Sequence, residues 1–249
     1  MARFDRFLNI EVYLCQIKRI EAWNHVGRVC TQSRLEMRMM KNVVVTVKTL
    51  SASVLIMSSM LMSIVVSAQG NAEAGADKIT VCLACHGQDG NMSQLDNVPK
   101  IGGQNEKYLL KQMLDIKSGV RSAPLMTGML NALNEQDLAD VAAYYASQPI
   151  ATGAADPEKV AMGQELYRAG NAEIGVAACS ACHSPDGQGL ASAGYPALSG
   201  QDPAYTEMQL KAFRGGVRMN DDSEIMRSIA ARLRDDEISA LASYVSGLR

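Results

Sequence analysis

A five-residue motif occurs twice in this chain, inside a longer duplicated segment. Residues 82–86 read CLACH, and residues 179–183, 97 positions later, read CSACH. The same offset aligns Asp89 with Asp186, Pro99 with Pro196, Gly103-Gln104 with Gly200-Gln201, Tyr108 with Tyr205, Gln112 with Gln209 and Arg121 with Arg218. Near the ends of the two segments the offset becomes 100, which pairs Leu133 with Leu233 and Tyr144 with Tyr244. Such self-similarity predicts a duplicated domain.

Each copy predicts short helices joined by loops. Apolar residues return at helical spacing in residues 108–116 and 205–213. Further helices are expected over 74–81, over 157–169 after an Asp156 N-cap, and from Asn134 or Glu135 and Asp235 to the end of each copy. No alternating run is long enough for a sheet, so the predicted class is all-α. We expect two domains, residues 69–150 (the first repeat) and 151–249 (the second repeat), with a linker at about 148–156.

The residues before the repeats predict export. Lys41 and Lys48 accompany an apolar run over residues 50–66, which ends in small residues before Ala68. This pattern is typical of a secretory signal peptide at 40–68, cleaved after Ala68. A membrane anchor is the alternative, but five serines interrupt the run. Residues 1–39 precede a complete signal and are expected to be an extension from a misplaced start codon.

Residues 69–249 are acidic and have few cysteines and histidines. Residues 69–249 carry 15 Lys and Arg against 22 Asp and Glu, a formal net charge of −7. An acidic surface argues against binding to nucleic acid. The cysteines and histidines of this region all lie in the two motifs, at Cys82, Cys85, His86, Cys179, Cys182 and His183.

The C-x-x-C-H spacing predicts covalent attachment of haem. Two thiols about one helical turn apart can bond the vinyl groups of haem c, and the adjacent imidazole can ligate its iron. A zinc site would leave the histidines unexplained, and a redox disulfide of the thioredoxin type expects a βαβ context that is missing here. The sequence therefore predicts two covalently bound haem c groups, with His86 and His183 as iron ligands.

Methionine is the expected ligand on the other face of each iron, because both histidines are already used. The candidates are Met92, Met113, Met126 and Met129 in the first repeat, and Met208, Met219 and Met226 in the second. Met126 pairs with Met226 at offset 100, whereas Met129 pairs with it only at offset 97. Met126 and Met226 are favoured, with Met129 and Met219 as the alternatives.

Other aligned residues are candidates to support the haem groups. Pro99 and Pro196 each lie 13 residues after a motif histidine, where a backbone carbonyl could accept from its Nδ1 atom. A turn proline is the alternative. Tyr108, Tyr195 and Tyr205 could bond haem propionates, and a role in the core is equally compatible with the sequence.

Together these residues resemble a known family, cytochrome c4. The resemblance covers the chain from residue 69 onward and rests on the motifs PKIGGQ at 99–104, YLLKQM at 108–113, MTGM at 126–129, YPALSGQ at 195–201 and IMRSIAA at 225–231. It implies two class I cytochrome c domains whose propionate edges face each other, and it supports Met126 and Met226 as ligands. It also implies transfer of electrons to a haem-copper terminal oxidase in the bacterial periplasm, in some members with attachment to the inner membrane.

The leading hypothesis is therefore a dihaem electron carrier, not an enzyme, between a quinol-oxidising complex or another donor and a terminal oxidase. A second hypothesis is the electron-transfer subunit of a periplasmic dehydrogenase, such as a sulfide-oxidising flavocytochrome. A third hypothesis, a dihaem peroxidase, would need a coordination position on the iron that is open to peroxide. The region has a histidine and a methionine candidate for each iron, which argues against an open position.

Overall fold

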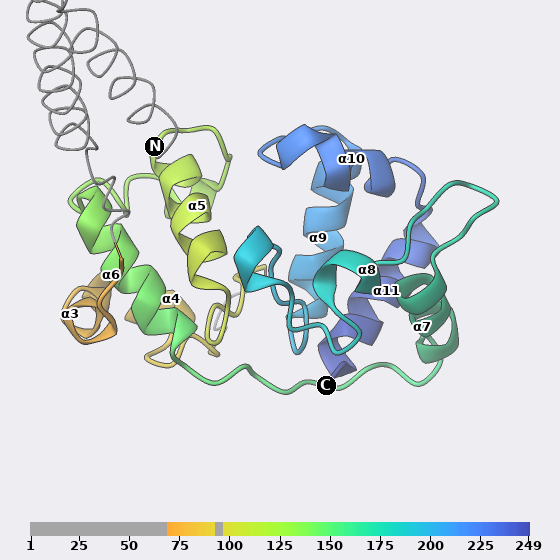
Figure 1. The fold of residues 1–249 in the computed structure, drawn as a ribbon, viewed down its shortest axis with the longest axis horizontal. Helices are drawn as coiled ribbons and strands as arrows, with labels where there is room; N and C mark the ends of the chain where they lie inside the picture. The colour runs from red at the N-terminus through yellow and green to blue at the C-terminus, as the bar shows by residue number, and fades with distance from the viewer. Residues whose placement is uncertain (1–68, 93–96) are drawn as a thin grey trace, which may run out of the picture. The chain divides into compact units, whose positions relative to one another are not determined.

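The computed structural model describes residues 69–92 and 97–249 (Figure 1). The expected signal peptide at 40–68 and the expected extension at 1–39 lie outside these residues. The first repeat contains α3 (Ala72–Ala76), η1 (Ile79–Val81), α4 (Leu83–His86), α5 (Glu106–Lys117), η2 (Pro124–Met126) and α6 (Glu135–Ala146). The second contains α7 (Val160–Ala169), α8 (Ser180–His183), η3 (Ala191–Ala193), α9 (Pro203–Arg214), η4 (Asp222–Glu224), α10 (Ile225–Ala230) and α11 (Asp235–Gly247).

The two repeats pack their helices in the same way. In the first, α3 and α5 both contact the closing helix α6; in the second, α7 and α9 both contact the closing helix α11 (Figure 1). Across the described ranges the β-structure consists of two isolated bridges, Asn171 with Val176 and Leu190 with Tyr195. The all-α prediction is confirmed. None of the helices in these ranges is long and apolar enough to cross a membrane.

The closing helices begin where the sequence predicts. Asn134 accepts from the backbone N–H of Asp137, and the Asp137 carboxylate accepts from the N–H of Asn134, which forms a capping box for α6. In α11 the acidic first turn starts at Asp235. Negative side chains at a helix N-terminus are favourable for the helix dipole.

The entry helices differ from the prediction. Asn71 caps α3, which starts at Ala72 and ends at Ala76, and the predicted helix over 74–81 is broken by a turn before η1. In the second repeat α7 begins at Val160 instead of 157. The Asp156 carbonyl accepts from the N–H of Lys159, so Pro157 stands in a turn before the helix rather than in its first turn.

Each entry helix crosses its closing helix at a glycine. A Cβ atom on Gly163 would lie 2.4 Å from the carbonyl oxygen of Ala240 and 2.6 Å from the Cβ of Tyr244. Gly75 has the same relationship to Asp140 and Tyr144 in the first repeat. The backbones of the crossing helices therefore approach more closely than any side chain would allow.

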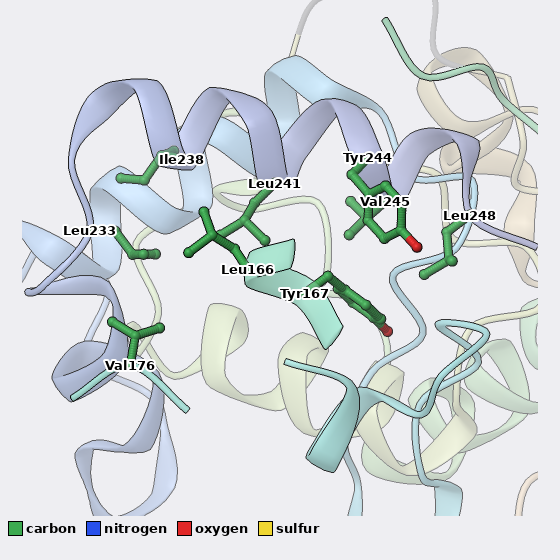
Figure 2. Close-up of a cluster of buried hydrophobic side chains, with 9 residues drawn as sticks. All are labelled: Leu166, Tyr167, Val176, Leu233, Ile238, Leu241, Tyr244, Val245 and Leu248. Carbon is green, nitrogen blue, oxygen red and sulfur yellow. The ribbon is translucent and has the colours of Figure 1, made fainter. Parts of the chain in front are cut away.

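The core of each repeat lies along its closing helix. Figure 2 shows the second repeat, in which Leu241 and Val245 of α11 face Leu166 and Tyr167 of α7. The corresponding cluster of the first repeat is smaller and consists of Ile79, Leu109, Val141, Ala142 and Tyr145. Cys82 and Cys179, the first residues of the two C-x-x-C-H motifs, pack against these clusters.

Candidate functional site

Each C-x-x-C-H motif forms one helical turn. The N–H of His86 donates to the carbonyl of Cys82 at 2.9 Å, and the N–H of His183 donates to the carbonyl of Cys179 at the same distance. Residues four apart lie on one face of such a turn. The imidazole and the first thiol of each motif therefore face the same side, and all four thiols are free of disulfides.

Both imidazoles are buried, and each has its own backbone carbonyl as a hydrogen-bond partner. The Nδ1 atom of His86 lies 3.0 Å from the carbonyl oxygen of Pro99, and the Nδ1 atom of His183 lies 2.9 Å from the carbonyl oxygen of Pro196. A carbonyl can only accept, so the proton is on Nδ1 and Nε2 keeps its lone pair. Burial lowers the pKa of both histidines, which favours the neutral form that ligates metals. The predicted role of the two prolines is confirmed.

Before haem is attached, the surroundings of the first thiol of each motif disfavour its thiolate form. Burial raises the pKa of Cys82, and it raises the pKa of Cys179 to about 11. A half-buried thiol with a raised pKa exchanges more slowly with disulfides than a free thiol does. In the described part of the chain no group of three or more His, Cys, Asp or Glu side chains could hold a metal ion, so the zinc alternative has no ligand set there.

A cavity of about 810 Å³ runs between the two motifs and is lined mainly by apolar side chains. All four motif cysteines and both histidines line it. Of the methionine candidates, Met126 and Met226 line this cavity together with Met113 and Met208. Met129 and Met219 are not part of the lining, and they are 43% and 60% exposed. The structure thus brings the favoured methionines to the same cavity as the histidines.

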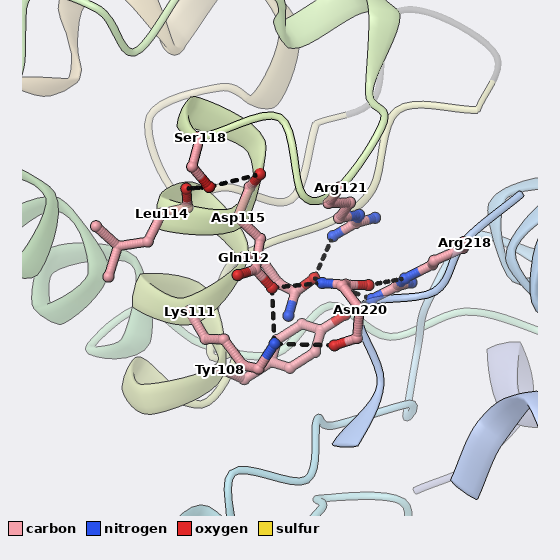
Figure 3. Close-up of polar contacts among 9 residues, drawn as sticks. All are labelled: Tyr108, Lys111, Gln112, Leu114, Asp115, Ser118, Arg121, Arg218 and Asn220. Carbon is pink, nitrogen blue, oxygen red and sulfur yellow. Dashed lines mark hydrogen bonds and ion pairs between the residues drawn. The ribbon is translucent and has the colours of Figure 1, made fainter. Parts of the chain in front are cut away.

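A polar network joins the two repeats at this cavity (Figure 3). Arg121 donates to Gln112 in its own repeat at 2.8 Å and to the Tyr205 hydroxyl in the other repeat at 2.8 Å. Arg218 makes the related bonds, to Gln209 at 2.8 Å and to the Tyr108 hydroxyl at 3.0 Å. Burial alone would raise the pKa of Tyr108, but the charges of Arg218 and Arg121 outweigh it and lower that pKa.

The network is not fully symmetric. Asn220 donates to Gln112 at 2.9 Å and to the Asp115 carboxylate at 2.7 Å, and Asp115 pairs with Lys111. The positions aligned with Lys111 and Asp115 in the second repeat are Met208 and Ala212, which carry no charge. The charged pair therefore lies on the first repeat's side of the network.

The residues at the cavity fit haem c. Arg121 and Arg218 are 9% and 8% exposed, and within the described ranges neither forms an ion pair with a carboxylate. A buried guanidinium is costly without a counter-charge, so an anionic group is expected beside it. The carboxylates of haem propionates have that charge, while the thiols and imidazoles offer covalent and iron ligands.

The sequence did not assign a role to the two arginines or to Gln112 and Gln209. A signal was present, because the same polar residues stand at the aligned positions of both repeats. Tyr108 and Tyr205 were expected to contact propionates or the core. The structure places their hydroxyls on the arginine of the opposite repeat, and it places Tyr195 in the cavity lining.

Comparisons with known proteins agree with this site. The cytochrome c family model matches residues 72–148 and again 160–249. Cytochrome c4 from Pseudomonas aeruginosa is 54% identical over 182 residues, which is 73% of this chain and 90% of the relative. The crystal structure of reduced recombinant cytochrome c4 from Pseudomonas stutzeri superposes with a TM-score of 0.70 at 49% identity, covering 72% of this chain and 100% of that chain. The thiosulfate dehydrogenase electron acceptor of Stutzerimonas stutzeri is 35% identical over 183 residues, 72% of this chain and 83% of the relative.

These matches confirm two tandem cytochrome c domains and two covalently bound haem c groups. The zinc and disulfide alternatives are excluded with them. The protein is an electron-transfer cytochrome and not an enzyme. The chain belongs to the cytochrome c4 family.

Proposed function

We propose that this protein carries electrons one at a time in the periplasm, from a respiratory donor such as a quinol-oxidising complex to a haem-copper terminal oxidase. The observation that supports this proposal is the arrangement of each motif. A buried, neutral imidazole and a methionine reach the same cavity in both repeats. With a histidine and a methionine as its iron ligands, each haem would have no position open to a substrate, which leaves electron transfer as its chemistry.

The ligand assignment is part of this proposal. Cys82 and Cys85 attach one haem and Cys179 and Cys182 the other. His86 and Met126 are the iron ligands in the first repeat, and His183 and Met226 in the second. When bound, each haem supplies a one-electron change between ferric and ferrous iron. A thioether is a soft, neutral ligand, so it favours the ferrous state and raises the reduction potential.

The chain's own residues prepare the cavity for this role. Pro99 and Pro196 fix the direction of the two imidazole rings, which limits rearrangement of the ligands during electron transfer. Arg121 and Arg218 line the cavity and would offer positive charge to the propionates of bound haem. Apolar side chains around the motifs keep water away from the metal, which also favours the less charged ferrous state.

The location follows from the residues before the repeats. We propose that residues 40–68 are a signal peptide removed on export, that residues 1–39 are not part of the mature protein, and that the mature chain consists of domains 69–150 and 151–249 with the linker at about 148–156. Its two domains carry formal net charges of −3 and −4, so charge alone does not distinguish the docking surface of a donor from that of an acceptor. Peripheral attachment to the inner membrane is compatible with this arrangement.

A second candidate function is the acceptor subunit of a periplasmic dehydrogenase. It is favoured by the 35% identity to a protein named as the electron acceptor of thiosulfate dehydrogenase. The cytochrome c4 relatives are more similar to this chain, which favours the respiratory role.

Stopped-flow absorbance separates the two functions. The reduced protein is mixed with detergent-solubilised haem-copper oxidase, and the oxidised protein is mixed with a thiosulfate dehydrogenase and thiosulfate. Fast oxidation of both haems by the oxidase, slowed by added salt because docking is electrostatic, supports the carrier role. Fast reduction by the dehydrogenase without oxidation by the oxidase supports the second function.

A further inference from the structure

Two buried glutamines connect the repeats close to the haem ligands. Gln201 accepts at Oε1 from the backbone N–H of Lys100 at 2.9 Å and donates from Nε2 to the Lys100 carbonyl at 2.8 Å. One side-chain amide of the second repeat thus satisfies both backbone groups of a single residue in the first. Gln201 is 9% exposed, so water does not compete with these bonds.

The first repeat makes the same contact in the opposite direction. Gln104 accepts at Oε1 from the N–H of Ala197 at 2.8 Å and donates from Nε2 to the Ala197 carbonyl at 2.9 Å. Gln104 and Gln201 are an aligned pair in the two repeats, as are Lys100 and Ala197. The contact is therefore reciprocal, and each repeat holds a loop of the other.

The residues held in this way are next to the histidine acceptors. The N–H of Lys100 and the carbonyl of Pro99 belong to one peptide group, and that carbonyl accepts from Nδ1 of His86. The N–H of Ala197 and the carbonyl of Pro196 likewise form one peptide group, which accepts from Nδ1 of His183. Each motif histidine is thus linked through a single peptide to a glutamine of the other repeat.

We propose that Gln104 and Gln201 are positioning residues that tune the reduction potential of the haem in the opposite repeat. Hydrogen bonds in a chain polarise one another, so an acceptor on the peptide N–H makes the peptide carbonyl a stronger acceptor for Nδ1–H. A stronger bond at Nδ1 increases the basicity of the imidazole as a ligand. A more basic ligand stabilises ferric iron, so each glutamine lowers the potential of the haem across the interface.

The backbone before each glutamine is built for this contact. Gly103 and Gly200 have φ values of +66° and +69°, in the left-handed region that favours glycine. A Cβ atom on Gly200 would lie 1.8 Å from the Ala151 carbonyl oxygen. The glycine before each glutamine therefore allows both a left-handed turn and close packing against the linker, at Ile150 for Gly103 and at Ala151 for Gly200.

The proposal predicts a crossed effect that a simple interface contact would not produce. Gln201→Leu in the holoprotein removes the acceptor for the Lys100 N–H, and we expect the first-repeat haem to rise in potential while the second-repeat haem changes much less. Gln104→Leu is expected to raise the reduction potential of the second-repeat haem instead. The expected size is about a threefold to tenfold change in the reduction equilibrium constant, or about 28 to 59 mV for one electron.

The test is a redox titration followed by NMR, which reports each haem through its own ring-methyl signals. Gln136→Leu is the control, because this exposed glutamine bonds Asp140 and the Gln69 carbonyl, away from both motifs. It should leave both potentials unchanged. Gln201→Glu gives the Lys100 N–H a charged and therefore stronger oxygen acceptor, and it should lower the potential of the first-repeat haem below the wild-type value, by more than that of the second-repeat haem.

Three outcomes would overturn the proposal: equal shifts of both haems, a shift confined to the haem of the mutated repeat, or unchanged potentials. If the leucine variants do not assemble with two haems, Gln201→Glu decides alone: a first-repeat potential lowered more than the second supports the proposal, and any other result contradicts it. The inference rests on the proposed ligands His86 and His183. Their hyperfine-shifted imidazole signals in the wild-type ferric protein test that assignment separately.

Discussion

Arg218 donates a hydrogen bond of 3.0 Å from Nη2 to the hydroxyl of Tyr108 in the opposite repeat. Arg121 has the corresponding bond to Tyr205 at 2.8 Å. Each of these two buried guanidinium groups thus finds a neutral hydrogen-bond acceptor in the opposite repeat. The hydroxyls are needed because a buried guanidinium that loses an acceptor keeps its full desolvation cost.

Removal of either hydroxyl should therefore destabilise the protein. For Tyr108→Phe and for Tyr205→Phe we expect a loss of about 1–3 kcal/mol in the free energy of unfolding, measured by urea denaturation of the holoprotein. Tyr144→Phe is the control, since its hydroxyl donates to the Gln88 carbonyl in an exposed setting, and the change expected there is within about 0.5 kcal/mol. A loss in the control as large as in the two variants would contradict the role of the arginines.

The methionine assignment predicts a spectroscopic result. Ferric haem with a methionine ligand has a weak far-red absorption band, and two such haems contribute to it here if Met126 and Met226 are ligands. Met126→Ala and Met226→Ala should each remove half of this band, measured by visible absorption of the ferric protein. Met129→Ala and Met219→Ala should leave it intact, because neither residue lines the cavity. Loss of the band in Met129→Ala would instead make Met129 the first-repeat ligand.

The crossing of α7 and α11 predicts a steric effect. Gly163→Ala would place a Cβ atom 2.4 Å from the Ala240 carbonyl oxygen, so the helices would have to separate. We expect a loss of about 1–3 kcal/mol in stability to urea, the usual cost of overpacking. Gly215→Ala is the matched control, because a Cβ atom there would lie 3.4 Å from its nearest neighbour and the residue has a negative φ. Equal stability of Gly163→Ala and wild type would show that the helices can move apart freely.

Acid should weaken the contact between α6 and the turn after α3. The hydrogen bond from Lys78 lowers the pKa of Asp140 to about 2 and also lowers the pKa of Asp137. A carboxyl whose pKa is depressed in the folded state stabilises the protein above its ordinary pKa of about 3.9, and that stabilisation is lost as the pH falls toward the folded value.

Wild type should therefore unfold at a higher temperature than Asp140→Asn. This difference in unfolding temperature should be constant from pH 7 to about pH 5 and should shrink between about pH 4 and pH 2. The exposed Asp77, mutated to Asn, should show no comparable dependence. An advantage that does not change with pH would mean that the charge of Asp140 does not contribute.

Features that recur in both repeats, or that depend on a capping residue, could be predicted from the sequence. The motif cysteines and histidines, the Pro99 and Pro196 carbonyls and the starts of α6 and α11 all have local signals, either a fixed spacing or a capping residue. The ligand roles of the histidines and methionines stay predictions.

Features that depend on contacts between distant parts of the chain were predicted wrongly or not at all. The start of α7 was misplaced because Pro157 is compatible with both a first helical turn and an open turn. The tertiary contact of the Asp156 N–H with the Ser243 hydroxyl accompanies the turn. The roles of Gln201 and Arg218 were missed because their partners are more than 100 residues away, at Lys100 and Tyr108. Alignment of the repeats marks such residues as equivalent but does not reveal that each contacts the other repeat.

Peptide mass spectrometry of the exported protein tests the central claim most directly. After proteolysis, the peptide with Cys82 and Cys85 and the peptide with Cys179 and Cys182 are each expected to carry the added mass of one haem, bound through both sulfurs. Recovery of either peptide with two free thiols from the exported protein would contradict the account of a dihaem electron carrier.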